Sequence, residues 1–506
     1  MKFLPNKNAV LFHIRKYLVF YVIICIIIFL RTYKVADFFS FNFDEEYQAS
    51  LAWEQVKNWH PIWIGVSASN INYYLGPGFV YLNALLFALS SGDPAILAWF
   101  STILGIATTI SIYYVVSKIF NKRIGLIAMT LYGGSAFLML FDRRFWNPSP
   151  IPFITIWMIY SLIQGKKHPQ WYIVSIALYA VSLHVHLSLV LFLPLILASI
   201  LIDRKKIRLL HWLFGFIVYT VITIPLLIFD LVHNFDNLLA PIRYVFTPET
   251  GVFGSSIAYI QRHLIVMFSA LGKLWFLRFQ TNIQDEHCLS SHCNIVQGKW
   301  YLILLSILLI VTFIYFAWKR RTRTNLILTF GILIYFCIYI FYSGYAAEYF
   351  LLSMYVMCCI VFAFILSKLL NGILVPFLTI FLIANAGVIF TMNQDQYGLS
   401  NRKKLVKQIT DILHNQPFSL ETYGTDPRYY HPYGGWRFLF KIYGHNTPVK
   451  SMADDSFGWI YPDELNQEQP KMKVVVMDTI KYKSKDKPVF VVKEGVYYGY
   501  IYRISD

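Results

Sequence analysis

Long apolar segments are the feature that most constrains what this chain can fold into. Inside a bilayer the backbone finds no water, so a segment of about 20 apolar residues must satisfy its own hydrogen bonds as a helix. Apolar segments of this kind, some of them shorter, lie at residues 17–30, 94–120, 124–141, 149–163, 171–183, 187–202, 209–231, 300–318, 326–342, 349–369 and 373–391. We therefore predict an α-helical polytopic membrane protein with about eleven transmembrane helices and additional external juxtamembrane helices.

The net charge of +17 would suggest nucleic acid as a partner if the protein were soluble. The composition argues against this, because 57% of the residues are hydrophobic and only 14% are charged. Soluble domains are about one quarter charged, and a disordered chain would be far less apolar. We expect the lipid bilayer to be a partner and nucleic acid not to be one.

The distribution of Lys and Arg predicts the orientation. Residues 73–90 are apolar but short, and Gly76-Pro77-Gly78 interrupts them. Counting them as a span would place several short basic loops outside, so the positive-inside rule favours an interfacial or re-entrant element. By the same rule, residues 171–202 form two helices joined by a tight hairpin near residues 184–186. The N-terminus is then cytoplasmic, and the positive excess falls in the cytoplasmic segments.

Three large pieces lie outside in this topology: a loop at about residues 32–93, a loop at about 232–299, and the C-terminal region. We divide the chain into a membrane domain, residues 1–392, and an extracytoplasmic domain, residues 393–506. The second begins with an amphipathic helix pattern and continues with short apolar strands, which predicts a small external α/β domain. The helix pattern is formed by Leu405, Ile409, Ile412 and Leu413, and the strands lie at residues 474–477 and 488–500.

Two of the six cysteines, Cys288 and Cys293, lie in the second external loop. A disulfide is permitted outside the membrane, and it is the interpretation that we favour. His287 and His292 adjoin the two thiols, so plain thiols and a zinc site stay open as alternatives. The other four cysteines lie within spans, where they face lipid or pack between helices.

Asp44-Glu45-Glu46 is the most informative acidic cluster, about a dozen residues beyond the first span and on its external side. Desolvation against a membrane surface and mutual repulsion raise carboxylate pKa values. A raised carboxylate pKa suits a general base that works near neutral pH. The alternative is an acidic first turn of a juxtamembrane helix, capped by Asp or Asn.

A second cluster follows the third span and extends from Asp142 to Pro150. Arg143 and Arg144 are external, against the positive-inside pattern, and guanidinium groups suit phosphate oxygens. Asn147-Pro148-Ser149 also fits a turn that leads into a helix. This segment is therefore either a phosphate-binding loop or a structural turn.

Two further groups lie on the same side of the membrane. His184 and His186 lie at the external end of the fifth span, and Glu348 and Tyr349 at the start of the tenth. Each has a simpler interpretation, as a packed interfacial residue or as a helix cap. Together with the acids and arginines they predict a site at the outer water–lipid boundary, suited to a substrate with a lipid tail and a charged head group.

In their order along the chain, these motifs resemble those of the GT-C membrane glycosyltransferases, in particular the branch of the protein O-mannosyltransferases and the lipid A aminoarabinose transferase. The resemblance covers roughly residues 15–230 in its motifs and is topological beyond them. Its motifs are Arg31-Thr32-Tyr33, Asp44-Glu45, Gly76-Pro77-Gly78-Phe79-Val80-Tyr81, the run from Arg143 to Pro152 (RRFWNPSPIP) and His184-Val185-His186.

The resemblance implies transfer of a sugar from a polyprenyl-phosphate donor to a hydroxyl of a protein, lipid or polysaccharide acceptor, at the outer face of the cytoplasmic membrane. It implies that Asp44 is the base of an inverting reaction and that Glu45 supports it or holds a divalent metal. Cations would face the leaving phosphate, namely Arg143, Arg144, Arg262 or the two histidines. Glycine, proline and tyrosine of the third motif would line the lipid entry, namely Gly76, Pro77 and Tyr81.

One departure from the family pattern matters, because several relatives have a second Asp where Asn147 stands. Asp142, five residues earlier, is the alternative second acid. Another class of function also stays open, a polyprenyl-linked glycan ligase or polymerase, or a flippase-like transporter. A transporter buries charged residues near the middle of its spans, and these spans carry almost none, which favours surface chemistry. A non-catalytic scaffold is a third alternative.

Overall fold

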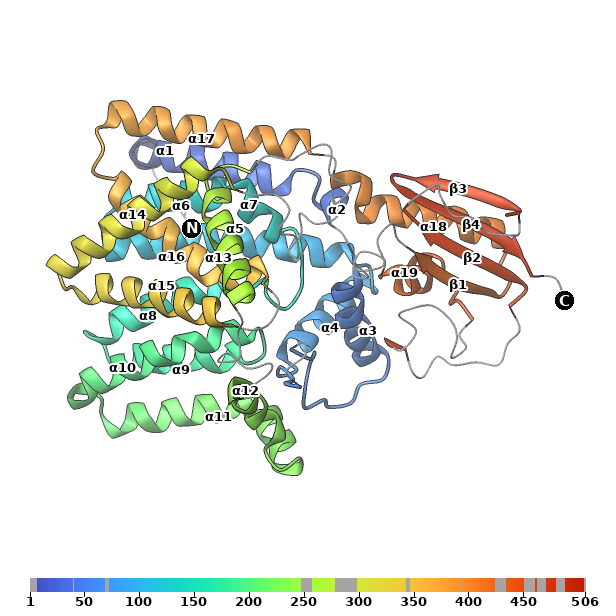
Figure 1. Ribbon diagram of the computed structural model, residues 1–506, viewed down its shortest axis with the longest axis horizontal. Helices are drawn as coiled ribbons and strands as arrows, with labels where there is room; N and C mark the ends of the chain where they lie inside the picture. Colours follow the sequence, from blue (N-terminus) through green and yellow to red (C-terminus); the bar gives the residue numbers. More distant parts are fainter. Residues whose placement is uncertain are drawn as a thin grey trace.

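The protein is a helical bundle with a small sheet domain at one end, as its computed structural model shows (Figure 1). The structure describes residues 7–39, 41–68, 72–246, 257–277, 298–342, 346–392, 394–423, 434–449, 460–461, 470–478 and 487–504. Helices α3 (Phe43–Lys57) and α4 (Gly78–Ser90) lie between the bundle and the sheet domain. The acids Asp44, Glu45 and Glu46 lie at this junction, in the first turn of α3.

Each predicted span coincides with one helix or with two consecutive helices. These are α1 (Lys7–Thr32), α5 (Ala95–Ile119), α6 (Lys122–Gly134) with α7 (Ala136–Phe141), α8 (Ile151–Gly165), α9 (Trp171–Ser182), η2 (Leu187–Phe192) with α10 (Leu193–Asp203), α11 (Leu209–Val232), α14 (Trp300–Lys319), α15 (Arg323–Phe341), η6 (Glu348–Leu351) with α16 (Leu352–Leu366), and α17 (Asn371–Thr391). Among the described residues, seven helices are long and apolar enough to cross a membrane, and four shorter apolar helices accompany them. The polytopic helical fold is confirmed, and the count of eleven crossings stays a prediction.

The bundle is organised around α16, which is buried along almost its whole length. Helices α6, α8, α14 and α15 pack against it. Because α16 is apolar on every side, it fits only a position enclosed by other helices. Helix α16 thereby fixes the short helix η6, with Glu348 and Tyr349, at the end of the bundle that faces α3.

The chain reverses direction after α9, as the hairpin prediction requires. Helix α9 ends at Ser182, and η2 and α10 return along it. The turn between the helices is tight, because the N–H groups of both Val185 and His186 donate to the carbonyl of Ser182, at 3.0 Å. The hairpin near residues 184–186 is confirmed, and it places both histidines at the end of the bundle that carries α3.

Two helices lie within the segment predicted as the second external loop, α12 (Asp236–Phe246) and α13 (Ile257–Lys273). Helix α13 is more than a loop element, because it packs against α14 and α15 and buries Val266, Met267 and Ala270. The predicted disulfide or metal residues Cys288, Cys293, His287 and His292 lie outside the described residues.

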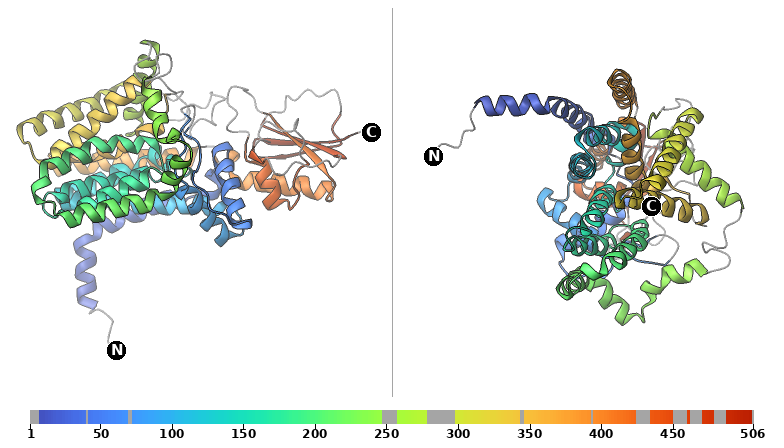
Figure 2. Two further views of the ribbon diagram at one scale, coloured as in Figure 1. Left: turned by 90° about the horizontal axis from the view of Figure 1, so that it is seen from below. Right: turned by 90° about the vertical axis from the view of Figure 1, so that its left-hand side faces the viewer.

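The N-terminal part of α1 leaves the bundle at a kink. Tyr17 has non-helical backbone angles, with φ −118° and ψ 15°, in the middle of this helix. Figure 2 shows the residues before the kink projecting away from the other helices. The apolar segment that follows, Tyr17–Thr32, is the part that packs in the bundle.

The C-terminal region forms the predicted small α/β domain. Its sheet has the strand order β1-β2-β4-β3, with β1 (Phe418–Tyr423) parallel to β2 (Met472–Met477). Strand β4 (Tyr497–Arg503) is antiparallel to β2 and to β3 (Phe490–Glu494). Helix α18 (Leu399–Leu413) buries Leu405, Ile409 and Leu413 in the domain core, and helix α19 (Trp436–Tyr443) packs beside it. The sequence suggested one strand over residues 488–500, and a turn at Gly495, with φ +57°, divides it in two.

Candidate active site

The acidic cluster forms the first turn of α3. Asn42 precedes the helix, and its backbone N–H donates to Glu45 Oε2 at 3.1 Å, as in a capping box. The helix-start interpretation of these acids is thus correct. It does not exclude a functional role, because successive helical residues project about 100° apart and the three carboxylates therefore face different surroundings.

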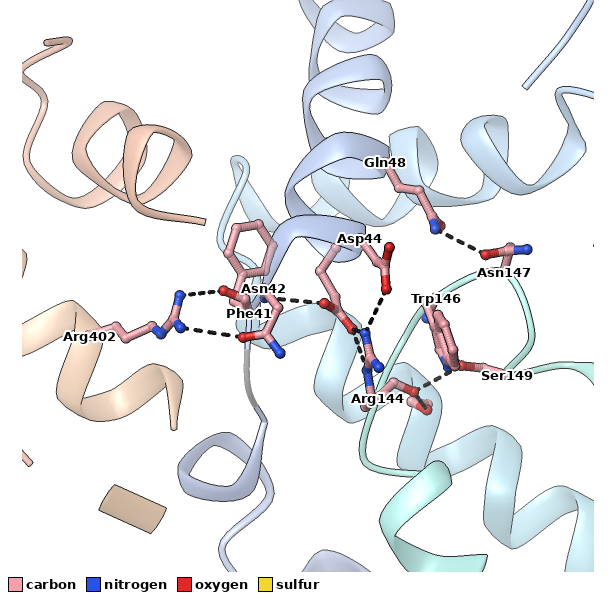
Figure 3. A network of polar contacts seen from close by, with 11 residues as sticks. Phe41, Asn42, Asp44, Gln48, Arg144, Trp146, Asn147, Ser149 and Arg402 are labelled. Carbon is pink, nitrogen blue, oxygen red and sulfur yellow. Dashed lines mark hydrogen bonds and ion pairs between the residues drawn. The ribbon is translucent and has the colours of Figure 1, made fainter. Parts of the chain in front are cut away.

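Arg144 joins two of the acids. Its guanidinium donates to Glu45 Oε1 at 2.8 Å and to Asp44 Oδ2 at 3.2 Å (Figure 3). The side chains of Arg144 and Glu45 are enclosed, with exposed fractions of 3% and 0%, whereas Asp44 is 21% exposed. Asp44 is therefore the most exposed member of this group, and Glu45 holds the cation beside it.

The charges of this group follow from burial and pairing. Burial raises the pKa of Glu45, and Arg144 offsets only part of that effect. Burial alone would lower the pKa of Arg144, but the negative charges of Glu45 and Asp44 outweigh it and raise the pKa. Arg144 thus stays protonated and supplies a fixed positive charge next to Asp44.

The loop between α7 and α8 holds Arg144 in place. The Arg144 carbonyl accepts hydrogen bonds from the Ser101 hydroxyl at 2.5 Å and from the Ser149 hydroxyl at 2.9 Å. The guanidinium lies over the Trp146 ring, 4.1 Å from its centroid, a cation–π contact. The turn predicted here is present, since the Ser149 N–H donates to the Trp146 carbonyl. The segment is a structural turn that also places a cation.

Asn147 connects this loop to two other elements. Gln48, one helical turn beyond Asp44 on α3, donates to Asn147 Oδ1 at 3.3 Å, and Figure 3 shows the two side chains pointing toward one another. The Asn147 amide nitrogen donates to the Val185 carbonyl at 3.0 Å. Gln48 was not among the predicted residues, although its spacing of four from Asp44 places it on the same helix face.

Three aromatic rings close this side of the site. The rings of Trp146 and Tyr349 meet edge to face with centroids 4.6 Å apart, and His186 meets Tyr349 at 5.6 Å. The structure therefore brings together predicted residues from four segments that are far apart in the sequence. These are Asp44 and Glu45, Arg144 and Asn147, His186, and Tyr349.

His184 does not join this aromatic group but packs against the Gly76-Pro77-Gly78 segment. Its Nδ1 accepts from the Gly78 N–H at 3.0 Å, and its Nε2 donates to the Ile222 carbonyl at 2.9 Å. A Cβ on Gly76 would lie 2.2 Å from His184 Nδ1, so glycine is required there. The Tyr81 hydroxyl binds the backbone of Ile62, accepting at 2.9 Å and donating at 3.1 Å. The predicted lipid-entry residues are thus part of the ordered junction beside α3.

Both histidines are held neutral by their surroundings. Burial lowers the pKa of His186 to about 3 and also lowers the pKa of His184. The pattern of hydrogen bonds at His184, one accepted and one donated, fits the neutral ring. Neither histidine is therefore suited to supply the positive charge that a leaving phosphate needs.

We expect His186→Asn to make the protein less sensitive to acid. A folded pKa of about 3, below the ordinary 6.5, means that His186 favours folding above pH 6.5 and that this contribution is lost as the pH falls. Between pH 7 and pH 5 the loss is about 2 kcal/mol. In the wild type, His186 Nδ1 accepts a hydrogen bond from the Ser188 N–H at 3.1 Å. The side-chain oxygen of Asn can accept the same hydrogen bond.

The free energy of unfolding in detergent, measured at pH 7 and pH 5 for both proteins, checks this expectation. The wild type should lose about 2 kcal/mol more than His186→Asn over this interval. Equal losses would show that His186 titrates normally and is open to solvent.

Other predicted residues serve the packing of the bundle. Asp142, the alternative second acid, is buried and paired with Arg31 of α1. Arg143 donates to the Leu30 carbonyl at 2.7 Å and lies over the Phe38 ring, 4.4 Å from its centroid. Burial lowers the pKa of Arg143 to about 9. These residues fix the exit of α1 rather than adjoin Asp44.

Glu348 forms a buried ion pair with Lys273 at the end of α13. The two side chains are 7% and 3% exposed, so each neutralises the other in an apolar setting. Lys273 gave no signal in the sequence, because its partner lies 75 residues away. Arg262, also on α13, is exposed.

The described residues contain no group of three or more His, Cys, Asp or Glu side chains arranged to hold a metal ion. Glu45 makes its contacts with Arg144 and with the Asn42 backbone. These contacts fit a supporting role for Glu45 better than a metal ligand.

Comparisons with known proteins agree with this architecture. Residues 75–229 match the family model of dolichyl-phosphate-mannose-protein mannosyltransferases. The fold is similar to that of ArnT from Cupriavidus metallidurans bound to undecaprenyl phosphate, with a TM-score of 0.61 and 11% identity over 96% of this chain and 98% of that chain. The apo state of the same enzyme gives a TM-score of 0.61 and 12% identity, over 97% and 98% of the two chains.

A third similar structure is the Archaeoglobus fulgidus oligosaccharyltransferase tethered with an acceptor peptide containing the NVT sequon. Its TM-score is 0.50 and its identity 13%, over 92% of this chain and 69% of that chain. No curated protein sequence matches the chain. The family model over residues 75–229 and the similar folds support a likeness to the GT-C superfamily of membrane glycosyltransferases. The narrower resemblance, to the branch of protein mannosyltransferases and ArnT, is confirmed.

Proposed function

We propose that this chain transfers a sugar from a polyprenyl-phosphate donor to an acceptor hydroxyl, with Asp44 as the general base. The observation that supports this most is the group formed by Asp44, Arg144 and Glu45 at the start of α3. One carboxylate is partly exposed, and a buried, fully paired cation holds it in a fixed position. This is the preorganisation that a base must have before its substrate binds.

Among the three neighbouring acids, Asp44 suits this role best. Glu45 is enclosed and bonded to Arg144 and to the backbone. Glu46 is also buried, and it accepts hydrogen bonds from Gly435, Phe438 and Tyr461. A base must reach the proton that it removes, so the greater exposed fraction of Asp44 favours it over the other two acids.

In the reaction, the acceptor hydroxyl gives its proton to the Asp44 carboxylate while its oxygen attacks the anomeric carbon. The new bond joins the acceptor oxygen to that carbon, and the bond between the carbon and the phosphate oxygen breaks. The electron pair of the broken bond leaves with the phosphate, which gains one negative charge. Arg144 is the cation that the structure places beside Asp44, and its positive charge favours this charge development.

The lipid character of the donor is supported by the surroundings of the site. The aromatic and glycine-rich segments around α4 adjoin it through His184. The similar structure of ArnT was solved with undecaprenyl phosphate, and we extend this ligand class to the present chain. In our proposal the site faces the outer side of the cytoplasmic membrane, with the N-terminus cytoplasmic and the C-terminal domain outside. The acceptor is a protein, lipid or polysaccharide hydroxyl.

The test is sugar transfer by the purified protein in lipid vesicles, supplied with sugars linked to polyprenyl monophosphate or to nucleoside diphosphate. We expect transfer only from the polyprenyl monophosphate donors, with one polyprenyl phosphate released for each sugar transferred. Transfer from the nucleoside diphosphate donors alone would contradict the proposal.

A further inference from the structure

The residues just before and within the first turn of α3 are bound on two sides. Arg144 binds Asp44 and Glu45 from the membrane domain, as described above. On the other side, Asn42 and Glu46 contact the C-terminal domain. A segment of five residues, 42–46, therefore carries the proposed base and both sets of contacts.

Glu46 binds the start of α19. Its carboxylate accepts hydrogen bonds from the Gly435 N–H at 2.6 Å, the Phe438 N–H at 3.1 Å and the Tyr461 hydroxyl at 3.0 Å. Gly435 has no side chain with which to cap α19, so Glu46 provides the acceptor from another domain. A negative charge is also favoured at this end of the helix dipole.

Arg402 of α18 makes the second set of contacts. It is fully buried and donates to the carbonyls of Phe41 and Gly434, at 2.6 and 2.7 Å, and to Asn42 Oδ1 at 3.3 Å. Figure 3 shows its guanidinium directed at Phe41 and Asn42. The same group lies between the rings of Trp436 and Tyr497, at 4.8 and 4.9 Å from their centroids.

Two glycines allow the domains to approach this closely. A Cβ on Gly435 would lie 2.2 Å from the Phe41 carbonyl oxygen, and a Cβ on Gly434 would lie 2.6 Å from the Phe43 Cα. Gly435 also has φ +95°, which favours glycine. Gly434 and Gly435 are thus placed where backbone of the C-terminal domain meets the start of α3.

We propose that the C-terminal domain, through Arg402 and Glu46, positions Asp44 for the reaction. Arg402 and Glu46 are positioning residues, since they act on Asp44 through the backbone of residues 41–46. The inference rests on the proposed function and deepens it, because it makes the C-terminal domain part of the active site. A reactive group displaced by about 1 Å loses roughly a hundredfold in rate, and removal of either contact frees the segment on one side.

The test compares Arg402→Gln with Lys403→Gln, the adjacent residue of α18. Lys403 also reaches the membrane domain, where it pairs with Asp93 at 3.2 Å, but it contacts none of residues 41–46 among the interactions described. The measured quantity is kcat per donor-binding site. The number of these sites is determined by titration with polyprenyl phosphate. We expect Arg402→Gln to lower this value about a hundredfold, Lys403→Gln to change it less than twofold, and Arg402→Lys to restore it in part.

A role in folding alone gives a different result. It would reduce the number of donor-binding sites and leave kcat per site unchanged, which would overturn the proposal. If Arg402→Gln does not fold, Glu46→Gln replaces it, because it keeps the side-chain volume and one amide oxygen while removing the charge. We expect it also to lower kcat per site, and an unchanged value would overturn the proposal.

Amide hydrogen exchange separates this inference from the proposed function. If the wild type transfers no sugar from any donor, the proposed function fails, but exchange of the amides of residues 43–48 is still measurable. We expect these amides to exchange at least about tenfold faster in Arg402→Gln than in Lys403→Gln, since local opening becomes easier when a contact is lost. Equal exchange in the two variants would show that the C-terminal domain does not hold this segment.

Discussion

Asp44→Asn should lower kcat for sugar transfer about 10²–10⁴-fold and leave the affinity for the donor within about threefold of the wild type. Asparagine keeps the shape of the side chain and an oxygen that can accept from Arg144, but it cannot take up a proton. A loss of this size is typical of the removal of a general base. It should lower kcat rather than donor binding, because the proton moves in the transition state.

The matched control for this variant is Asp236→Asn on α12. Asp236 is another acid of the segments predicted to be external. It is 63% exposed, and among the contacts described it pairs on the surface with Arg243 at 2.9 Å. Exposed pairs contribute little, so we expect its kcat to stay within twofold of the wild type. If Asp44→Asn kept more than half of the wild-type kcat, another group would have to be the base.

The second large effect is expected for Arg144→Met. Methionine leaves the Glu45 carboxylate buried without its cation, and breaking a buried pair in this way costs about 3–5 kcal/mol of stability. Transfer should fall as well, because Asp44 loses the contact at 3.2 Å that fixes it. The free energy of unfolding in detergent measures the first effect, and kcat per folded molecule the second.

A companion variant tests the physical reason for this loss. In Arg144→Met/Glu45→Gln no buried charge is left unpaired, so the double variant should regain most of the stability that Arg144→Met loses. Glu45→Gln alone lowers the free energy of unfolding of the wild type by some amount. If it lowered that of Arg144→Met by the same amount, the two residues would act independently. That result would contradict the pairing seen in the structure.

The stability of Arg144→Met should also depend on pH in a defined direction. Burial already raises the pKa of Glu45 above its ordinary 4.5, and without Arg144 the pKa rises further. A raised carboxyl pKa favours folding below the ordinary value and loses this contribution as the pH rises through the folded pKa. Relative to the wild type, Arg144→Met should therefore be more stable at pH 5 than at pH 8.

Much of the fold was predictable because the membrane limits the choices. Apolar segments that must satisfy their own backbone become helices, and the positive-inside rule then selected the hairpin at residues 184–186, which the structure contains. Helix α13 was missed, because Arg262 and His263 interrupt its apolar face and the segment resembled a loop. A helix that packs against other helices tolerates such residues when they point outward or find partners.

The site was predictable in its location but not in its contacts. Residue types and spacing placed Asp44, Glu45, Arg144, Asn147, His186 and Tyr349 at one boundary, and the structure brings them together. The pairing of Lys273 with Glu348 and the reach of Arg402 to residue 41 depend on tertiary packing over 75 and 361 residues. No local pattern encodes such distances. The sequence also could not predict the protonation state of the histidines, because it depends on how far burial lowers their pKa.

The anomeric configuration of the product tests the central claim most directly. If the acceptor oxygen, deprotonated by Asp44, attacks the anomeric carbon as the polyprenyl phosphate leaves, the transferred sugar has the configuration opposite to that of the donor. The measurement uses a donor of known anomer and reads the product by the one-bond coupling between C1 and H1. Inversion is the result that we predict. Retention would require either a covalent sugar–enzyme intermediate or attack from the face that the phosphate leaves, and it would contradict an inverting attack with Asp44 as the base.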